Sequence, residues 1–149
     1  MGKLCDEAYM LFGKYIGNCD GEATRFRFDG IKNGEVVKSV VKSAMTKLCL
    51  NVDVSSTELV EDKTYDVAAI RIKITDEYGN VMPFFNRQAL LEAEGDLEIL
   101  GPALADINGG MGGIYVRSTG KQGKGTVKIS LPDHGLSSEI KFNIKAGAV

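Results

Sequence analysis

The sequence predicts an all-β fold: an immunoglobulin-like β-sandwich preceded by a short N-terminal helix and a hairpin. The first observation behind this prediction lies in residues 67–75, where isoleucines at every second position alternate with arginine, lysine and threonine. This period of two is typical of a strand with one buried and one exposed face. The second observation is that short alternating segments recur over roughly the last 100 residues, separated by turns rich in Gly, Pro and Asn.

Length and composition limit the classes of protein that the chain can represent. Its 149 residues suffice for one ordinary domain, or for one domain plus part of another. The net charge of −2, with both signs interspersed, gives no electrostatic basis for binding nucleic acid or an anionic membrane. No apolar run approaches the roughly 18 residues that span a bilayer. We therefore expect a globular protein whose partners include neither nucleic acid nor membrane.

Residues 3–16 are expected to form the only helix. Its apolar side chains recur every three to four residues and therefore share one face. This apolar stripe consists of Leu4, Ala8, Leu11, Phe12, Tyr15 and Ile16. Gly17 and Asn18 indicate the C-terminal end of the helix. Because an isolated helix of this length is only marginally stable in water, we expect Leu4, Leu11, Phe12 and Tyr15 to form an interdomain contact, either with the sandwich or with a part outside this chain.

A β-hairpin is expected next, over residues 25–41. Residues 25–28 alternate Arg and Phe, and Asn33-Gly34 is a strong signal for a two-residue hairpin turn. Residues 43–46 are interpreted as a linker. The predicted domain organisation is therefore 1–45, a helix plus hairpin that forms the tail of a preceding segment, followed by 46–149, the sandwich.

The sandwich is expected to contain seven or so short strands, with an up-and-down barrel as the main alternative. After the strand at 67–75 the chain is expected to reverse at 76–80, where Gly79 and Asn80 tolerate positive φ, and the apolar pattern resumes at 81–85. Residues 55–57 and 62–64 are interpreted as flanking a kinked segment before the strand at 67–75. The predicted strands are 48–54, 67–75, 88–94, 97–100, 113–117, 125–131 and 138–145.

Two glycine-containing segments superficially suggest phosphate-binding loops. The run Gly109–Gly113 is followed by a strand-like segment, whereas a phosphate-binding loop opens a helix. We interpret it as a turn where two backbones pass closely. Residues 118–126 have the wrong register for a Walker loop, and we interpret them as a basic hairpin tip.

The residue types that usually carry catalysis or metal binding form no recognisable motif, and we assign no catalytic, cofactor-binding or metal-binding residue. His134, the only histidine, lies in a turn-like segment without an aligned serine and acid. Cys5, Cys19 and Cys49 are odd in number and lack C-x-x-C spacing. They predict free thiols in a reducing compartment, the cytoplasm, rather than disulfides or a zinc site.

The acidic residues also give no catalytic pair. Glycosidases need two carboxyl groups about 5–10 Å apart across a cleft. The alternating set Glu92, Glu94, Asp96 and Glu98 instead suggests a solvated face with no neighbouring pocket.

Several segments resemble, in order and spacing, the C-terminal region of β-galactosidase-like enzymes of glycoside hydrolase family 2. These segments are residues 65–72, 76–85, 97–102 and 109–117. Residues 14–18, 26–34 and 36–38 resemble the segment just upstream in those enzymes. The likeness is specific as a set and covers most of the chain. Cys19 departs from the pattern, because an aromatic residue is common there in the family.

The resemblance implies a structural rather than a catalytic role. The family's catalytic glutamates lie in a central (β/α)8 barrel, a fold of about 250 residues for which this chain is too short. The chain is expected to pack against the remaining domains of the parent glycosidase, or to contribute to a homo-oligomer. The parent enzyme is expected to hydrolyse β-galactosides by a retaining double displacement.

The alternative function is a free-standing carbohydrate-binding or adhesin-type immunoglobulin-like module. The aromatics available for such a role are Tyr78, Phe84, Phe85 and Tyr115. Of these, Phe84 and Phe85 are expected to serve the core. A binding module should expose a planar aromatic platform or a calcium cage, whereas a domain of a larger enzyme should expose an apolar patch and no cleft.

Overall fold

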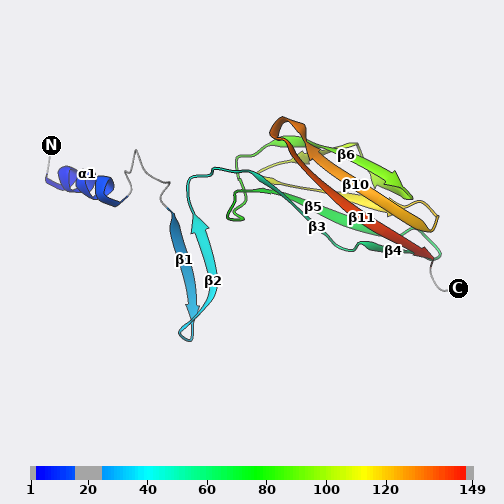
Figure 1. Cartoon of the computed structure of the whole chain (residues 1–149), viewed down its shortest axis with the longest axis horizontal. Helices are drawn as coiled ribbons and strands as arrows, with labels where there is room; N and C mark the ends of the chain where they lie inside the picture. Colours follow the sequence, from blue (N-terminus) through cyan, green and yellow to red (C-terminus); the bar gives the residue numbers. More distant parts are fainter. Residues whose placement is uncertain (1–2, 16–24, 147–149) are drawn as a thin grey trace. The chain divides into compact units, whose positions relative to one another are not determined.

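The computed structural model describes residues 3–15 and 25–146 of the chain. The chain divides into two compact units, Met1–Thr46 and Lys47–Val149. Each is described by itself below, and Figure 1 labels the helix and most of the strands.

The described part of the first unit contains one helix, α1, over Lys3–Tyr15. Asp6 in the first turn and Lys14 in the last turn suit the positive and negative ends of the helix dipole. The predicted residues Ile16, Gly17 and Asn18 lie outside the described part of the chain. No helix within the described ranges has the length and hydropathy to span a membrane.

The predicted hairpin is confirmed as β1, Phe26–Lys32, paired antiparallel with β2, Glu35–Lys42. Both residues of its turn have positive φ, 54° at Asn33 and 83° at Gly34, as a type I′ turn requires. The hydroxyl of Ser39 and the guanidinium of Arg27 both donate to the Asp29 carboxylate and lower its pKa. No side chain of either strand is fully buried, so the hairpin has no core of its own.

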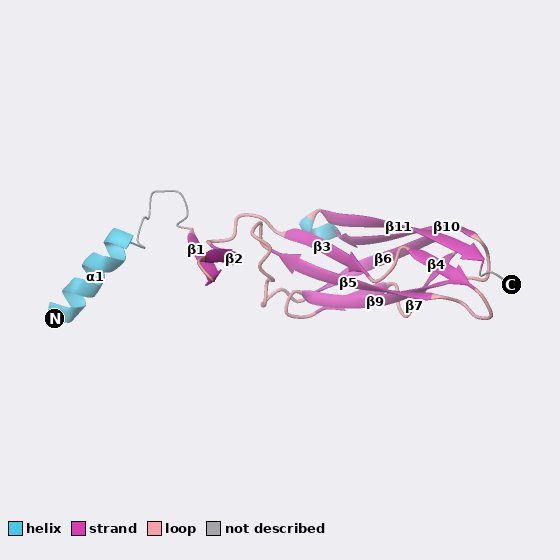
Figure 2. Cartoon of the chain, turned by 90° about the horizontal axis from the view of Figure 1, so that it is seen from below, coloured by secondary structure: helices cyan, strands magenta, loops and turns pink. Residues whose placement is uncertain are grey.

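The second unit is a sandwich of two sheets, and the predicted all-β class is confirmed. One sheet has the strand order β3-β5-β9-β7 and the other has the order β4-β11-β10-β6-β8. In Figure 2, β10 and β11 run along one side of the sandwich and β5 and β9 along the other. The strands are β3 Cys49–Val54, β4 Glu58–Glu61, β5 Val67–Thr75, β6 Arg87–Gly95, β7 Leu97–Leu100, β8 Leu104–Ile107, β9 Met111–Ser118, β10 Gly123–Leu131 and β11 Leu136–Ala146.

Strand pairing identifies the sandwich as immunoglobulin-like. All named strand pairs are antiparallel except β4 with β11, which is parallel. Because the strands form two separate sheets, the up-and-down barrel is excluded for the described chain. A short 3-10 helix, Pro132–His134, connects β10 to β11.

The core lies between the inner faces of the two sheets. Each long strand contributes alternate residues to it, as the period-two pattern predicts. From β5 come the three isoleucines that dominate the sequence pattern, each at most 1% exposed. The largest buried side chains from the other strands are Leu59, Ile107, Val116, Val127, Ile129 and Phe142.

The structure corrects the prediction at two strands. β4 and β8 were not predicted, because each has four residues and buries only one or two of them. Such short segments carry too little alternation to be distinguished from connections.

The apolar pattern that resumes at residues 81–85 does not form a strand. Only Val81 forms a bridge, to Thr75, and the chain then turns so that the Phe85 N–H donates to the carbonyl of Met82. Phe84 was expected in the core but is 93% exposed. Phe85 does pack against the core, as expected.

The glycine-rich run 109–113 is confirmed as a turn with close backbone contact. Gly110 has φ of 75°, and a Cβ added there would lie 2.4 Å from the carbonyl oxygen of Met82. Residues 118–126, in contrast, are not a hairpin tip. They connect β9 in one sheet to β10 in the other. The local sequence does not reveal whether two successive strands pair with each other or lie in different sheets.

Candidate functional site

The candidate site is a shallow hollow of about 370 Å³ in the second unit, whose side chains are held by several hydrogen bonds. We call it the polar hollow. It lies where β4 ends, β5 and β7 begin and β9 ends. Strand register brings these segments together, since Glu98 and Val67 both lie opposite Arg117. The lining residues are Glu61, Asp62, Lys63, Thr64, Tyr65, Glu98, Arg117, Ser118, Thr119 and Gly120.

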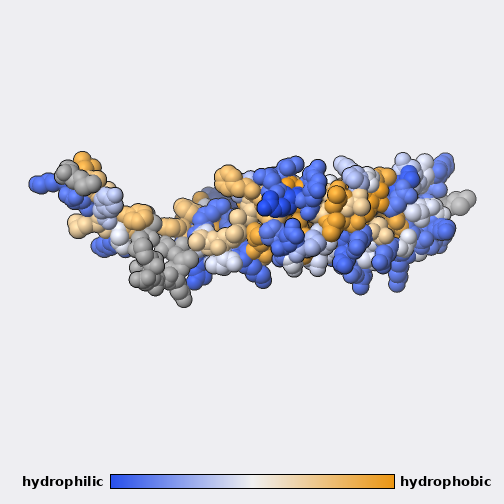
Figure 3. All heavy atoms as spheres, turned by 90° about the horizontal axis from the view of Figure 1, so that it is seen from above, coloured by the Kyte–Doolittle hydropathy of each residue, from blue (hydrophilic) through white to orange (hydrophobic). Residues whose placement is uncertain are grey.

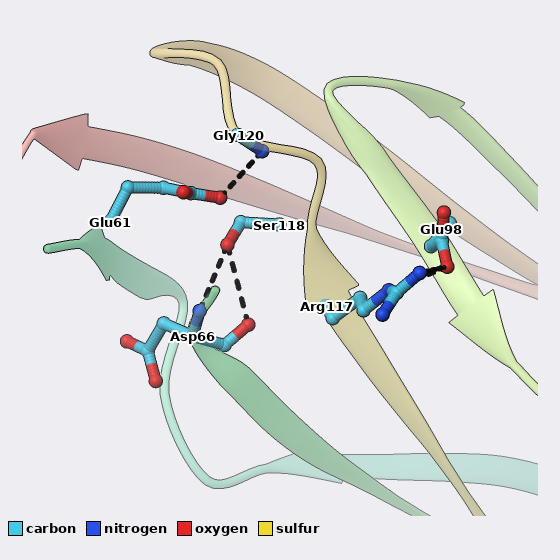
Figure 4. Close-up of polar contacts among 6 residues, drawn as sticks. All are labelled: Glu61, Asp66, Glu98, Arg117, Ser118 and Gly120. Carbon is cyan, nitrogen blue, oxygen red and sulfur yellow. Dashed lines mark hydrogen bonds and ion pairs between the residues drawn. The ribbon is translucent and has the colours of Figure 1, made fainter. Parts of the chain in front are cut away.

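Ser118 fixes one wall of the polar hollow. Its side chain is almost fully buried, with 2% of the residue exposed. The N–H of Asp66 donates to its Oγ at 3.0 Å, and its own N–H donates to the Asp66 carbonyl at 3.1 Å. Figure 4 shows the serine hydroxyl between the backbone N–H and the backbone carbonyl of Asp66. The start of β5 is therefore tied to the end of β9.

Arg117 and Glu98 form the opposite wall. The Nε of Arg117 donates to Oε1 of Glu98 at 2.5 Å, and Nη2 contacts the same oxygen. Figure 4 shows the two side chains pointing toward each other from neighbouring strands. The guanidinium carbon also lies 4.8 Å from the centre of the Tyr65 ring, a cation–π distance. Three side chains from β7, β9 and the β4–β5 connection thus hold one another in place.

Glu61 closes the third side. Its Oε1 accepts a hydrogen bond of 2.7 Å from the N–H of Gly120, which ties the end of β4 to the connection between β9 and β10. Figure 4 shows this contact beside Ser118. The polar hollow is consequently formed by groups whose positions are set before any ligand arrives.

Replacing Ser118 with alanine is expected to lower the free energy of unfolding by about 1–3 kcal/mol, because the Asp66 N–H loses its partner in a largely buried position. Urea unfolding followed by circular dichroism measures the change. Ser55→Ala is the matched control, since Ser55 Oγ accepts from the Ala69 N–H at 2.9 Å but is exposed to water. An equal loss in both variants would contradict the structural role of Ser118.

The lining of the polar hollow contains three carboxylates, Glu61, Asp62 and Glu98, and no histidine. His134 is exposed and lies beside the Phe85 ring, with 5.1 Å between ring centroids. In the described part of the chain, no group of three His, Cys, Asp or Glu residues could hold a metal ion. Two of the lining carboxylates are already engaged, Glu61 by the N–H of Gly120 and Glu98 by Arg117, and the arrangement offers polar groups to a ligand.

The glutamates that were predicted to share one face lie in two different hollows of the second unit. Glu92 and Glu94 line a second hollow of about 280 Å³ together with Lys128 and Glu139, so the expectation of no neighbouring pocket is wrong. Glu92 lies 3.5 Å from the Lys128 ammonium, and both side chains are largely exposed, which fits a solvated face. Glu98 belongs instead to the polar hollow.

The predicted interdomain residues lie on α1. Leu4, Leu11 and Phe12 are 85%, 51% and 53% exposed, whereas the side chain of Tyr15 lies outside what the structure describes. Tyr9, which the sequence pattern did not include, is 69% exposed and lines an apolar depression of about 310 Å³ with Cys5, Ala8 and Phe12. Figure 3 shows apolar spheres on the surface of this helix. Neither Cys5 nor Cys49, the cysteines in the described ranges, forms a disulfide.

Comparison with known proteins places this fold among the glycoside hydrolases. No family model matches the chain. A β-galactosidase of Thermoanaerobacter pseudethanolicus is 28% identical over 103 residues, which are 69% of this chain and 13% of that protein. A β-galactosidase of Rhizobium radiobacter is 28% identical over 125 residues, which are 84% of this chain and 86% of that protein.

Solved structures give the same result at the level of fold. A glycosyl hydrolase family 2 member from Bacteroides cellulosilyticus matches 83% of this chain with a TM-score of 0.66 and 17% identity. A β-glycosidase from Bacteroides vulgatus matches 82% with a TM-score of 0.65 and 18% identity. This chain spans 18% and 17% of those proteins. The resemblance to the C-terminal immunoglobulin-like region of glycoside hydrolase family 2 enzymes is confirmed.

Proposed function

We propose that this chain is a non-catalytic structural domain of a β-galactosidase-type glycoside hydrolase that acts in the cytoplasm. The observation that carries the proposal is the 28% identity to two β-galactosidases over 103 and 125 residues. One of those enzymes extends far beyond the match, which covers 13% of its length. The chemistry would then reside in other domains of the parent enzyme, whose reaction is the hydrolysis of β-galactosides.

The first unit supports a docking role toward the rest of such an enzyme. None of the described side chains in residues 3–46 is fully buried. A 13-residue helix and a two-stranded hairpin are each marginal in water without a packing partner. A structural match that covers 83% of this chain is longer than the second unit, so it includes part of the first. These facts favour a unit that is stabilised by neighbouring domains.

We assign this contact to the predicted interdomain residues of α1, Leu4, Leu11, Phe12 and Tyr15. The described side chains among them, Leu4, Leu11 and Phe12, are exposed, and exposed Tyr9 lies on the same helix. Apolar side chains this exposed on one helix face are typical of surfaces that other protein covers. The occupant is the remainder of the parent glycosidase, since the larger relatives continue well beyond the matched region.

Removal of residues 1–46 is expected to leave the midpoint of thermal unfolding of residues 47–149 unchanged within about 2 °C, because every fully buried core residue lies in the second unit. Differential scanning calorimetry of the two chains measures this. A large fall in the midpoint would mean that the first unit packs on the sandwich, and the docking proposal would then be wrong.

The proposal also predicts the behaviour of the isolated chain toward substrate. We expect the 149-residue protein to release no product from a fluorogenic β-galactoside, because the proposal assigns the chemistry to other domains of the parent enzyme. The matched control is Glu98→Gln. Turnover by the original chain that disappears in this variant would contradict the proposal.

A free-standing carbohydrate-binding module is the second candidate, and one observation favours it. Phe84 and Tyr115 are 93% and 58% exposed, as aromatics that contact a ligand would be. Phe84 lies in the connection between β5 and β6, and Tyr115 lies on β9. Exposed aromatics are equally enriched at protein interfaces, so they serve the structural proposal as well.

A further inference from the structure

We infer that the polar hollow is a binding site for a neutral sugar. The inference does not depend on the proposed function, because the hollow is complete within the second unit. Its volume of about 370 Å³ lies within the roughly 300–1,000 Å³ range of small-ligand sites. It also combines the exposed aromatic ring of Tyr65 with polar groups that are held by hydrogen bonds.

The ion pair leaves an acceptor on Glu98 and a donor on Arg117 available. Arg117 uses Nε and Nη2 on a single oxygen of Glu98, Oε1. For the second oxygen of Glu98, and for Nη1 of Arg117, the described residues provide no hydrogen-bond partner. A sugar presents hydroxyl groups on neighbouring carbons, each of which can donate and accept. One hydroxyl can donate to the carboxylate while its neighbour accepts from the guanidinium.

Preorganisation lowers the cost of binding at this position. Arg117 is held by Glu98 and by the ring of Tyr65, and Glu61 is held by the N–H of Gly120. Side chains that are already fixed lose little conformational freedom when a ligand arrives. Tyr65 is 52% exposed, so part of its apolar surface remains for contact with the C–H groups of a sugar ring.

The charges of the lining favour a neutral ligand over an anion. Glu61, Asp62 and Glu98 are acidic, and Lys63 and Arg117 are basic, so the acidic groups exceed the basic groups by one. The charge of Arg117 is already compensated by Glu98. A carboxylate or phosphate would therefore enter a hollow with net negative charge. The chemistry points to a neutral pyranoside and against a uronate.

The test is a titration of the ¹⁵N-labelled 149-residue chain with methyl β-galactoside, followed by NMR. We expect saturable shifts of the Thr119 and Gly120 amides, with a dissociation constant on the order of millimolar. Methyl β-glucuronide, the charged analogue, is expected to bind at least tenfold more weakly. An absence of saturable shifts up to about 100 mM galactoside would overturn the inference, and so would tighter binding of the glucuronide.

Two variants locate the site. Tyr65→Ala is expected to weaken galactoside binding by about tenfold, with the remaining spectrum unchanged. Tyr115→Ala is the matched control, since Tyr115 is similarly exposed at 58% but does not line the hollow. It is expected to change the dissociation constant less than twofold.

If Tyr65→Ala proves poorly folded, Glu98→Gln, which keeps the side-chain shape, is expected to weaken binding as well. Full binding by a folded Tyr65→Ala or Glu98→Gln variant would overturn the assignment.

Discussion

Replacing Phe142 with alanine is expected to lower the free energy of unfolding of the second unit by about 3–5 kcal/mol. Phe142 is 2% exposed and is among the largest fully buried side chains of the described chain. It lies on β11 opposite Gly125 of β10, so no side chain directly across the strand pair can move in to fill the space. The substitution therefore removes apolar burial and leaves a cavity. Chemical denaturation at constant temperature measures the loss.

Phe84→Ala is the matched control for Phe142→Ala. It makes the same chemical change at a position that is 93% exposed, where substitutions usually alter stability by less than about 0.5 kcal/mol. If the two variants lost similar stability, the arrangement of the core described above would be wrong. Phe84→Ala also tests whether Phe84 lies in an interface. If the variant keeps its stability but binds a partner protein or a ligand more weakly, Phe84 contacts that partner or ligand.

Gly95→Ala is expected to destabilise the sandwich by about 2–5 kcal/mol, for two separate reasons. Gly95 ends β6 with φ of 81°, a conformation that costs an alanine roughly 1–2 kcal/mol. A Cβ at this position would also lie 2.2 Å from the carbonyl oxygen of Lys124. Relieving that overlap requires β6 and β10 to separate, and such backbone shifts typically cost about 1–3 kcal/mol.

Gly79→Ala isolates the conformational part of this cost. Gly79 has φ of 82°, but an added Cβ would have no neighbour within 4 Å. We expect this variant to lose only the roughly 1–2 kcal/mol that positive φ imposes. The difference between Gly95→Ala and Gly79→Ala, measured by urea unfolding, reports the close approach of β6 and β10. Equal losses would mean that the two strands are farther apart than the structure places them.

The sequence predicts well those elements whose pattern is long and local. β5 was predicted with its observed bounds, because its isoleucines alternate with polar residues over the whole strand. The hairpin turn was predicted because Asn33-Gly34 suits the positive φ of both positions. β4 and β8 escaped prediction because Leu59, Ala105 and Ile107 are their only buried residues, and so few positions do not define a period.

The polar hollow could not be predicted from local patterns at all. Glu61, Glu98 and Arg117 are far apart in sequence and meet only through strand register. The one available signal was the opposite charge of Glu98 and Arg117, which becomes informative only once β7 and β9 are known to pair. Phe84 was misplaced for a related reason. An apolar residue in a strand-like run is expected inside, but the turn at Met82–Phe85 directs this one outward.

The central claim, that this sandwich serves as a structural domain of a β-galactoside-hydrolysing enzyme, is tested most directly on the natural protein. An antibody raised against residues 47–149 would precipitate the protein from an extract of cells that carry its gene. Its mass and its activity on a fluorogenic β-galactoside would then be measured. The claim predicts a polypeptide much heavier than 16.1 kDa whose precipitate hydrolyses the galactoside. A 16.1 kDa polypeptide without activity would contradict it and would favour the free-standing module.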